Sequence, residues 1–214
     1  MGTIGYLHTS PVHVPTFDRL TRGADAAVKA LHLVDEGALA TARAGDPQDV
    51  AELVARQVKN LADGGAEVIV CTCSTIGGVA ESVGPQVFSG SVLRVDRPMA
   101  RRAVAQGSRV GVVAALESTV QPTVELLREE AAAADREIDV VVEVAEGAWA
   151  HFEAGDHAAY LAVVAASARS MAMRADVVVL AQASMMGALD LLAEVVTPVL
   201  ASPPAAVAHA LDLL

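Results

Sequence analysis

Eight short runs of branched apolar residues, each continuous rather than alternating, constrain the fold of this chain most. They lie at residues 3–7, 31–34, 68–71, 92–95, 110–114, 140–144, 177–180 and 198–200. Continuous runs of this kind are typical of parallel strands that are covered on both faces. Longer segments with apolar residues at helical spacing separate them. The alternation predicts an α/β protein built on mostly parallel sheets.

Start signals precede several of the predicted helices. Asp46-Pro47-Gln48-Asp49 places a capping carboxylate before a proline at the first helical position, and Gly64-Gly65 ends the apolar pattern that follows. Ser118 to Pro122 is read as the start of a second helix, and further helices are predicted at residues 156–173 and 204–214.

The two halves of the chain carry similar strand endings. Glu67 opens a run that leads to Cys73, and Asp176 opens a run that leads to Gln182, six positions later in each case. We therefore predict two similar lobes, residues 1–96 and 97–202, each a mostly parallel four-stranded sheet flanked by helices. The lobes are expected to be related by pseudo-twofold symmetry, and the C-terminal helix, residues 203–214, is expected to complete the first lobe.

Charge and hydropathy exclude several classes of protein. The formal charge of −11 over 214 residues argues against nucleic-acid binding, which relies on basic patches, but still permits a small anionic ligand. The apolar stretch at residues 195–210 is broken by three prolines, so no membrane span is expected, and residues 1–17 do not resemble a secretory signal. With 53% apolar residues, a homodimer is plausible as a way to cover apolar surface.

Only two cysteines occur, Cys71 and Cys73, too close together for an ordinary loop-closing disulfide. This usage predicts a reducing, cytoplasmic setting. A Cys-x-Cys pair without a partner cluster is poor support for zinc, and no metal or nucleotide-binding motif is found. We expect no cofactor.

Candidate reactive residues follow the strands, because sites in open α/β sheets gather at the carboxyl ends of strands. Cys73 follows the third strand near an expected helix N-terminus, where backbone dipoles stabilise a thiolate. The alternative is a small buried hydrophobic residue, and this interpretation suits Cys71, inside the strand. His8, Thr9 and Ser10 follow the first strand and could bind a carboxylate or supply a proton, or simply form a capped turn.

Other polar residues have simpler explanations. Thr119, after the fifth strand, could bind an anion from the second lobe or act as an N-cap. The histidines and arginines without visible partners are expected at the surface or in packing: His32, His151, His157, Arg94, Arg97, Arg101 and Arg102.

Cys73-Ser74-Thr75 after a strand resembles the signature of the aspartate/glutamate racemase superfamily, which also contains hydantoin racemases, maleate isomerases and arylmalonate decarboxylases. Four further features resemble it: Ile4-Gly5 before a polar loop, the segment from Gly111 to Thr119, residues 198–203, and the plan of two similar lobes. The resemblance covers nearly the whole chain.

The resemblance implies a cofactor-independent reaction in which one thiol from each lobe flanks the acidic carbon of a small carboxylate or related carbonyl compound. One thiolate removes a proton and the opposite thiol returns one. Cys73 matches the first-lobe thiol. The matching substrate-binding residues are Thr9, Ser10, Ser74, Thr75 and Thr119.

The sequence departs from this pattern at two places. Gln182 stands where the second thiol is expected, followed by Ala183 where threonine is common and then by Ser184; all three are expected at the substrate. Glutamine is no acid or base near neutral pH, although its amide can donate a hydrogen bond to an oxyanion. His8 stands where glutamate racemases carry aspartate, and it is our candidate for the second base.

Three functions follow from these residues. The first is a racemase or isomerase that uses Cys73 as acid and base. The second is a one-thiol decarboxylase or lyase, motivated by Gln182. The third is a descendant that binds a small acid without turnover. The sequence does not select among aspartate, glutamate, hydantoins, maleate and malonates as ligands.

Overall fold

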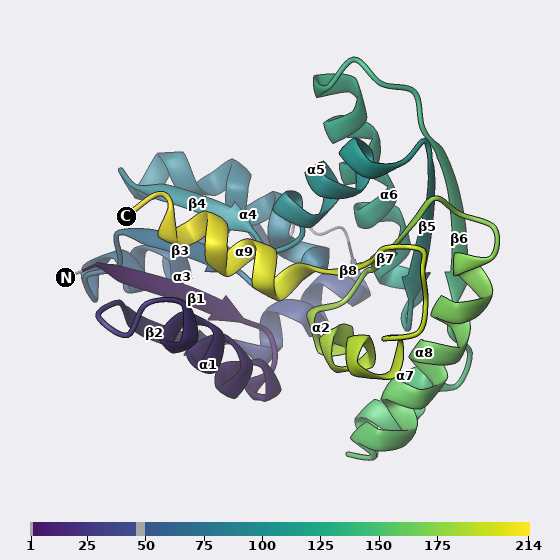
Figure 1. Ribbon diagram of the computed structural model, residues 1–214. Coiled ribbons are helices and arrows are strands. Elements are labelled where there is room, and N and C mark those ends of the chain that lie inside the picture. Colours follow the sequence, from purple (N-terminus) through teal and green to yellow (C-terminus); the bar gives the residue numbers. More distant parts are fainter. Residues whose placement is uncertain (1, 46–49) are drawn as a thin grey trace. The chain divides into compact units, whose positions relative to one another are not determined.

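The computed structural model describes residues 2–45 and 50–214 of the chain (Figure 1). The predicted helix start at 46–49 therefore lies outside the described residues. By its internal contacts the chain divides into two units. Unit 1 comprises Met1–Val95 and Pro203–Leu214, and unit 2 comprises Asp96–Ser202. Each unit is described by itself.

The sheet of unit 1 contains, among the described residues, four parallel strands in the order β2-β1-β3-β4. Their bounds are Thr3–His8 for β1, Lys29–Val34 for β2, Val68–Cys71 for β3 and Ser91–Arg94 for β4. All four were predicted, with ends that differ by no more than two residues.

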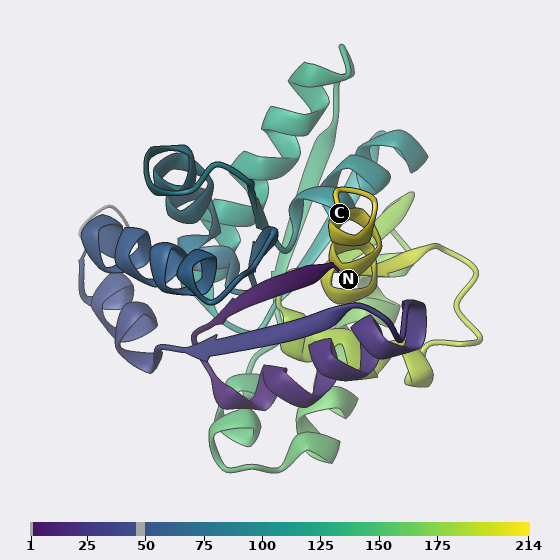
Figure 2. The ribbon, with the colours of Figure 1, turned by 90° about the vertical axis from the view of Figure 1, so that its left-hand side faces the viewer.

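Helices cover both faces of this sheet. They are α1 (Val14–Ala24), α2 (Glu36–Ala44), α3 (Ala51–Asp63), α4 (Ser74–Val87) and α9 (Ser202–Leu211), and a short 3-10 turn, η1 (Pro11–His13), precedes α1. Figure 2 shows α1 running alongside β2. Successive residues of β1 point to opposite faces, so Tyr6 contacts Phe17 of α1 whereas Leu7 packs into the core under α3 and α4. Both faces are therefore buried, as the continuous apolar runs indicated.

Unit 2 repeats this topology with four parallel strands, within the part of the chain that the structure describes, in the order β6-β5-β7-β8. The strands are β5 (Arg109–Ala114), β6 (Asp139–Val144), β7 (Val177–Leu180) and β8 (Val199–Ala201). The predicted fold class, two four-stranded parallel sheets flanked by helices, is confirmed.

Two separate apolar cores flank the sheet of unit 2. One packs β5 and β7 against α7 (Ala148–Glu153), α8 (His157–Ala172) and the 3-10 helix η3 (Ala183–Leu191). The other packs the opposite face against α5 (Arg97–Gln106) and α6 (Glu117–Ala133).

The start of α6 differs from the prediction. The helix begins at Glu117 with Leu116 as its N-cap, so Thr119 lies inside the first turn and is not a cap. Pro122 lies within the helix instead of at its beginning. A proline has no N–H to donate to the carbonyl four residues earlier, which is why it was read as a helix start.

Glu67, just before β3 of unit 1, and Asp176, just before β7 of unit 2, have the same structural role. A carboxylate oxygen of Glu67 accepts a hydrogen bond from the backbone N–H of Thr3, at 3.2 Å. Asp176 accepts from the N–H groups of Arg109 and Ser108, at 2.8 and 3.0 Å, and these bonds lower the pKa of its carboxyl group. Each acid therefore ties the start of one central strand to the start of its neighbour.

Candidate functional site

The predicted site residues of unit 1 gather at the carboxyl edge of its sheet. His8 is the last residue of β1, and Thr9 and Ser10 follow it. Cys73, Ser74 and Thr75 follow β3, which is paired in parallel with β1. Because parallel strands end at the same edge, the topology brings both groups together, as the sequence predicted.

Cys73 occupies the N-cap position of α4 in extended backbone conformation, with φ −112° and ψ 116°. Cys73 is partly exposed, whereas Cys71, two residues earlier, is fully buried in the core. The backbone N–H groups of the first turn of α4 follow Cys73 directly, and such groups stabilise negative charge. The position suits a thiolate, or an oxyanion formed next to the thiol.

Three of the other predicted residues here are also sheltered. Thr9, Ser74 and Thr75 are buried, and Ser10 is the N-cap of η1 without a side-chain capping bond. The hydroxyls of Thr9, Ser74 and Thr75 are therefore largely shielded from solvent. Their roles in substrate binding stay predictions.

Arg94 was expected at the surface, and this expectation is wrong. Only 6% of Arg94 is exposed, and its guanidinium donates to the backbone oxygen of Ser74 at 3.5 Å. A Cβ added at Gly77 would lie 2.7 Å from the Cβ of Arg94, so the glycine makes room for this side chain. The Gly77-Gly78 pair is the sequence feature that could have indicated a buried Arg94, because two glycines permit close packing on the first turns of α4.

A second unexpected feature is a histidine cluster on the α1 face of the sheet. His8 is fully buried, its Nδ1 lies 2.9 Å from the Thr72 hydroxyl, and its Nε2 lies 2.9 Å from Nδ1 of His32. His13 also approaches His8, with ring centroids 6.3 Å apart. His32 was expected to lack a partner; it is instead paired with His8.

Burial keeps this cluster neutral. It lowers the pKa of His8 to about 3, and electrostatic interaction with His32 and His13, which disfavours a positive charge on His8, lowers it further. Burial alone lowers the pKa of His13 to about 4. His32 is shifted in the same direction, again mainly by burial. A neutral imidazole has one donor and one acceptor nitrogen, so each ring here can pass a proton but holds no charge at neutral pH.

In unit 2, Gln182 takes the place in the fold that Cys73 takes in unit 1. It follows β7 by two residues, as Cys73 follows β3, and it is the N-cap of η3 with φ −120° and ψ 140°. Its side-chain oxygen accepts a hydrogen bond from the N–H of Ala115 at 2.6 Å. A backbone N–H requires an acceptor, so the oxygen must face Ala115 and the amide nitrogen faces elsewhere as a donor. Gln182 is therefore held in one orientation.

The remaining predicted residues of unit 2 lie at the same sheet edge. Thr119 is buried in the first turn of α6, Ala183 is buried, and Ser184 hydrogen-bonds the hydroxyl of Tyr160 at 2.7 Å. Burial raises the pKa of Tyr160 to about 12, although the bond to Ser184 opposes the shift. Tyr160 thus stays protonated and positions Ser184, a role that the sequence did not reveal.

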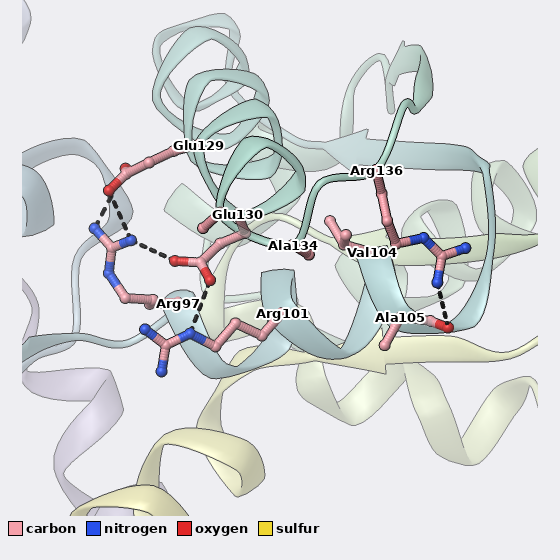
Figure 3. Close-up of a pocket in the computed structure, with 9 residues that line it drawn as sticks. Arg97, Arg101, Val104, Ala105, Glu129, Glu130, Ala134 and Arg136 are labelled. Atoms are coloured by element: carbon pink, nitrogen blue, oxygen red, sulfur yellow. Dashed lines mark hydrogen bonds and ion pairs between the residues drawn. The ribbon is translucent and has the colours of Figure 1, made fainter.

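Unit 2 also contains a pocket of about 440 Å³ between α5 and α6 (Figure 3). None of the predicted site residues lines it. Glu130, which is 6% exposed, accepts bonds from Arg97 and Arg101, and Arg136 donates to the backbone oxygen of Ala105 at 3.1 Å. Arg97 and Arg101 are paired with Glu130, and Arg136 binds a backbone oxygen, so we interpret the network as a link between the two helices.

Two other kinds of site are absent from residues 2–45 and 50–214. No group of three or more His, Cys, Asp or Glu side chains has a metal-binding arrangement there. Over the same residues, none of the helices combines the length and the apolar character that a membrane span requires.

Solved structures share the fold over almost the entire chain. An allantoin racemase from Klebsiella pneumoniae matches with a TM-score of 0.73 and 17% identity, covering 100% of this chain and 87% of that one. A glutamate racemase from Francisella tularensis, solved with D-glutamate, matches with a TM-score of 0.75 and 14% identity, covering 100% and 81%. An arylmalonate decarboxylase matches with a TM-score of 0.59 and 14% identity, covering 99% and 91%.

No protein-family model matches the sequence, and no curated protein gives a significant match. The structural likeness therefore shows the fold alone, and this fold is shared with the racemases and the arylmalonate decarboxylase described above. Proteins that share this fold include racemases and a decarboxylase, so a common architecture does not by itself fix one reaction.

Proposed function

We propose that the protein is a cofactor-independent enzyme that transfers a proton at the acidic carbon of a small carboxylate or related carbonyl compound, with Cys73 as acid and base. The observation that carries the proposal is the position of Cys73, a partly exposed thiol at the N-cap of α4, in a fold shared with racemases.

The chemistry follows from this position. A thiolate at Cys73 removes the proton from the carbon, and negative charge develops on the adjoining carboxylate or carbonyl oxygen. The N–H groups at the start of α4 and the hydroxyls of Ser74 and Thr75 are the donors proposed for that charge. The protonated thiol then returns a proton, which completes racemisation or isomerisation when the proton arrives on the other face.

A second candidate reaction is favoured by Gln182. Its amide is locked by the bond from Ala115 and supplies no acid or base at neutral pH. A chain with one thiol can still protonate a carbanion on a single face after loss of CO₂ or of another fragment. Decarboxylase or lyase chemistry is therefore the alternative to racemisation, again with Cys73 as the acid.

The test is proton NMR in deuterated buffer on a panel of aspartate, glutamate, hydantoins, maleate and malonates. Wild type is compared with Cys73→Ala and with Cys71→Ala, a matched control that removes the buried cysteine two residues away. We expect Cys73→Ala to lower the exchange or turnover rate by about 10²- to 10⁴-fold, the usual contribution of an acid–base group. Cys71→Ala should retain the activity.

The label also separates the two reactions. Deuterium in both enantiomers supports racemisation, and release of CO₂ with deuterium on one face supports decarboxylation. Turnover that survives Cys73→Ala would refute the mechanism. Saturable binding without any exchange would instead identify a small-acid-binding protein.

A further inference from the structure

The histidine cluster of unit 1 forms a continuous chain of hydrogen-bonding groups. The Thr72 hydroxyl lies 2.9 Å from His8 Nδ1, and His8 Nε2 lies 2.9 Å from His32 Nδ1. The chain begins beside Cys73 in the sequence and ends on β2, where the side chain of His32 is 16% exposed. It thus joins the carboxyl edge of the sheet to the α1 side of unit 1.

The two ends of this chain differ. At the inner end, the Thr72 hydroxyl also lies 3.2 Å from the backbone oxygen of Leu7, to which it can donate. At the outer end, Nε2 of His32 is buried without a hydrogen-bond partner, and the nearest carboxylate oxygen, on Asp18, is 3.9 Å away. That distance is longer than a direct hydrogen bond, so the outer end of the chain is not closed by Asp18 in this arrangement.

Two proton arrangements satisfy these contacts. In the first, Thr72 donates to Leu7, His8 donates from Nδ1 to Thr72, and His32 donates from Nδ1 to His8, which leaves Nε2 of His32 bare. In the second, Thr72 donates to His8, His8 donates from Nε2 to His32, and His32 carries its proton on Nε2, facing Asp18. Every ring is neutral in both, and the two differ only in tautomer.

We propose that Thr72, His8, His32 and Asp18 form a proton relay between the surface of unit 1 and the sheet edge that carries Cys73. This proposal rests on the proposed function, because the relay would restore the proton that Cys73 gives to the substrate carbon. His8, His32 and Asp18 are then positioning and relay residues. His8 would act through Thr72 instead of touching the substrate.

Protons balance along the relay. A proton binds Nε2 of His32, the Nδ1 proton of His32 moves to Nε2 of His8, and the Nδ1 proton of His8 moves to Thr72. In the proposal, the original hydroxyl proton of Thr72 leaves the relay at the sheet edge, and its acceptor is the thiolate of Cys73, the next residue along the chain. One proton enters and one leaves, and the first arrangement becomes the second.

Neighbouring groups keep the path neutral at rest. His13 and Tyr6 face the His8 ring, and Asp18 and Arg22 act on His32. The Tyr6 hydroxyl is occupied by Thr21 at 2.7 Å, and burial raises its pKa to about 12, so Tyr6 does not compete for the proton. Asp18 is the group that can attract a proton to the outer end.

The first experiment reads the tautomers by ¹⁵N NMR of histidine-labelled protein, and it needs no substrate. Asp18→Asn removes the outer charge, two links away from His8. We expect it to shift the Nδ1 and Nε2 signals of both His32 and His8, because the two rings must change tautomer together. His157→Asn, which alters an exposed histidine of unit 2, is the control and should leave these signals unchanged. If the Nδ1 and Nε2 signals of His8 were the same in Asp18→Asn as in wild type, the relay would be overturned.

The second experiment separates relay from structure. His32→Asn can still donate a hydrogen bond to His8 Nε2 but cannot pass a proton, whereas His32→Phe loses both. We expect both variants to slow Cys73-dependent exchange at least tenfold, with kcat and not KM affected, and added imidazole to restore part of the rate in His32→Asn. Full activity in His32→Asn would overturn the relay while leaving the Cys73 mechanism intact. Absence of Cys73-dependent exchange in wild type would instead refute the proposed function.

Discussion

Cys73 and Gln182 differ in chemistry although the backbone places them alike. Each follows a central strand by two residues and caps the next helix in extended conformation. Neighbouring positions also differ in polarity: Thr72 and His8 of unit 1 correspond to Ala181 and Ala114 of unit 2. At these three equivalent positions unit 1 carries polar or titratable side chains, whereas unit 2 carries two alanines and a fixed amide.

Replacing Gln182 tests how the difference between Cys73 and Gln182 affects proton exchange and stability. Gln182→Cys removes the bond from Ala115 and adds a thiol, so we expect a loss of about 1 kcal/mol in unfolding free energy and a gain of deuterium exchange on a second face. Gln182→Ala is the control, because it loses the same bond without adding a thiol. Chemical denaturation and NMR of the labelled product measure both effects. If Gln182→Cys and Gln182→Ala exchanged identically, the position would have no access to the reacting carbon.

Sequence reasoning placed Cys73 after a strand because that position depends only on a local pattern, an apolar run followed by polar residues. It missed the pairing of His8 with His32, which depends on strand register. His32 pairs with Tyr6 across the β1–β2 ladder, so His8, two residues further along β1, shares its face. Register depends on how the buried faces of both strands fit together, so it is not read from either strand alone.

At the scale of elements, the eight strands were predicted because buried parallel strands need continuous apolar runs. The helix α4 was harder, since it contains Gly77, Gly78, Gly84 and Pro85, all poor helix formers. Its glycines instead allow close packing: a Cβ at Gly84 would lie 2.5 Å from a methyl group of Val92 on β4. Tertiary contact therefore overrides local propensity in this helix.

The same argument applies to the paired glycines of the central strands. Gly5 and Gly111 are both the third residue of their strands, and a Cβ at Gly111 would lie 2.3 Å from Cγ of Met171 on α8. We expect Gly111→Ala to lower the unfolding free energy by about 1–3 kcal/mol through overpacking. Gly23→Ala, inside α1 with nothing within 4 Å, should instead be neutral or stabilising by up to about 1 kcal/mol.

Urea denaturation of both variants checks this prediction, since each adds a single methyl group. A Gly111→Ala variant as stable as wild type would show that α8 can move away from β5 without cost. The close approach of helix and strand would then not be a constraint on the fold.

At the scale of the whole molecule, two units with the same strand order hold different ionisable interiors. The described interior of unit 1 contains the buried histidine cluster, whereas unit 2 contains a buried carboxylate, Glu130, that is paired with arginines. The units should therefore respond differently to acid, although their topologies are equivalent.

Stability should fall as the pH is lowered through the histidine range. The pKa values of His8 and His13 are about 3 and about 4 in the folded chain, well below the ordinary value of 6.5. Below pH 6.5 the unfolded chain binds protons that the folded chain does not, so unfolding becomes easier as the pH falls. Each group then removes up to about 1.4 kcal/mol per pH unit until its folded pKa is reached.

Urea unfolding at intervals between pH 7.5 and pH 5 measures this slope. His13→Phe should make it shallower by about one proton, because it removes one titrating ring for which the structure shows no hydrogen bond within the described residues, while His157→Asn should leave it unchanged. Hydrogen exchange at pH 5 locates the effect: amides of β1 and β2 should lose protection before those of β5 and β6, since the protonated rings lie in unit 1. Equal loss in both units, or an unchanged slope in His13→Phe, would mean that other groups carry the acid sensitivity and that the cluster tolerates charge. Such tolerance would also weaken the argument for neutral tautomers in the relay, so one measurement bears on both.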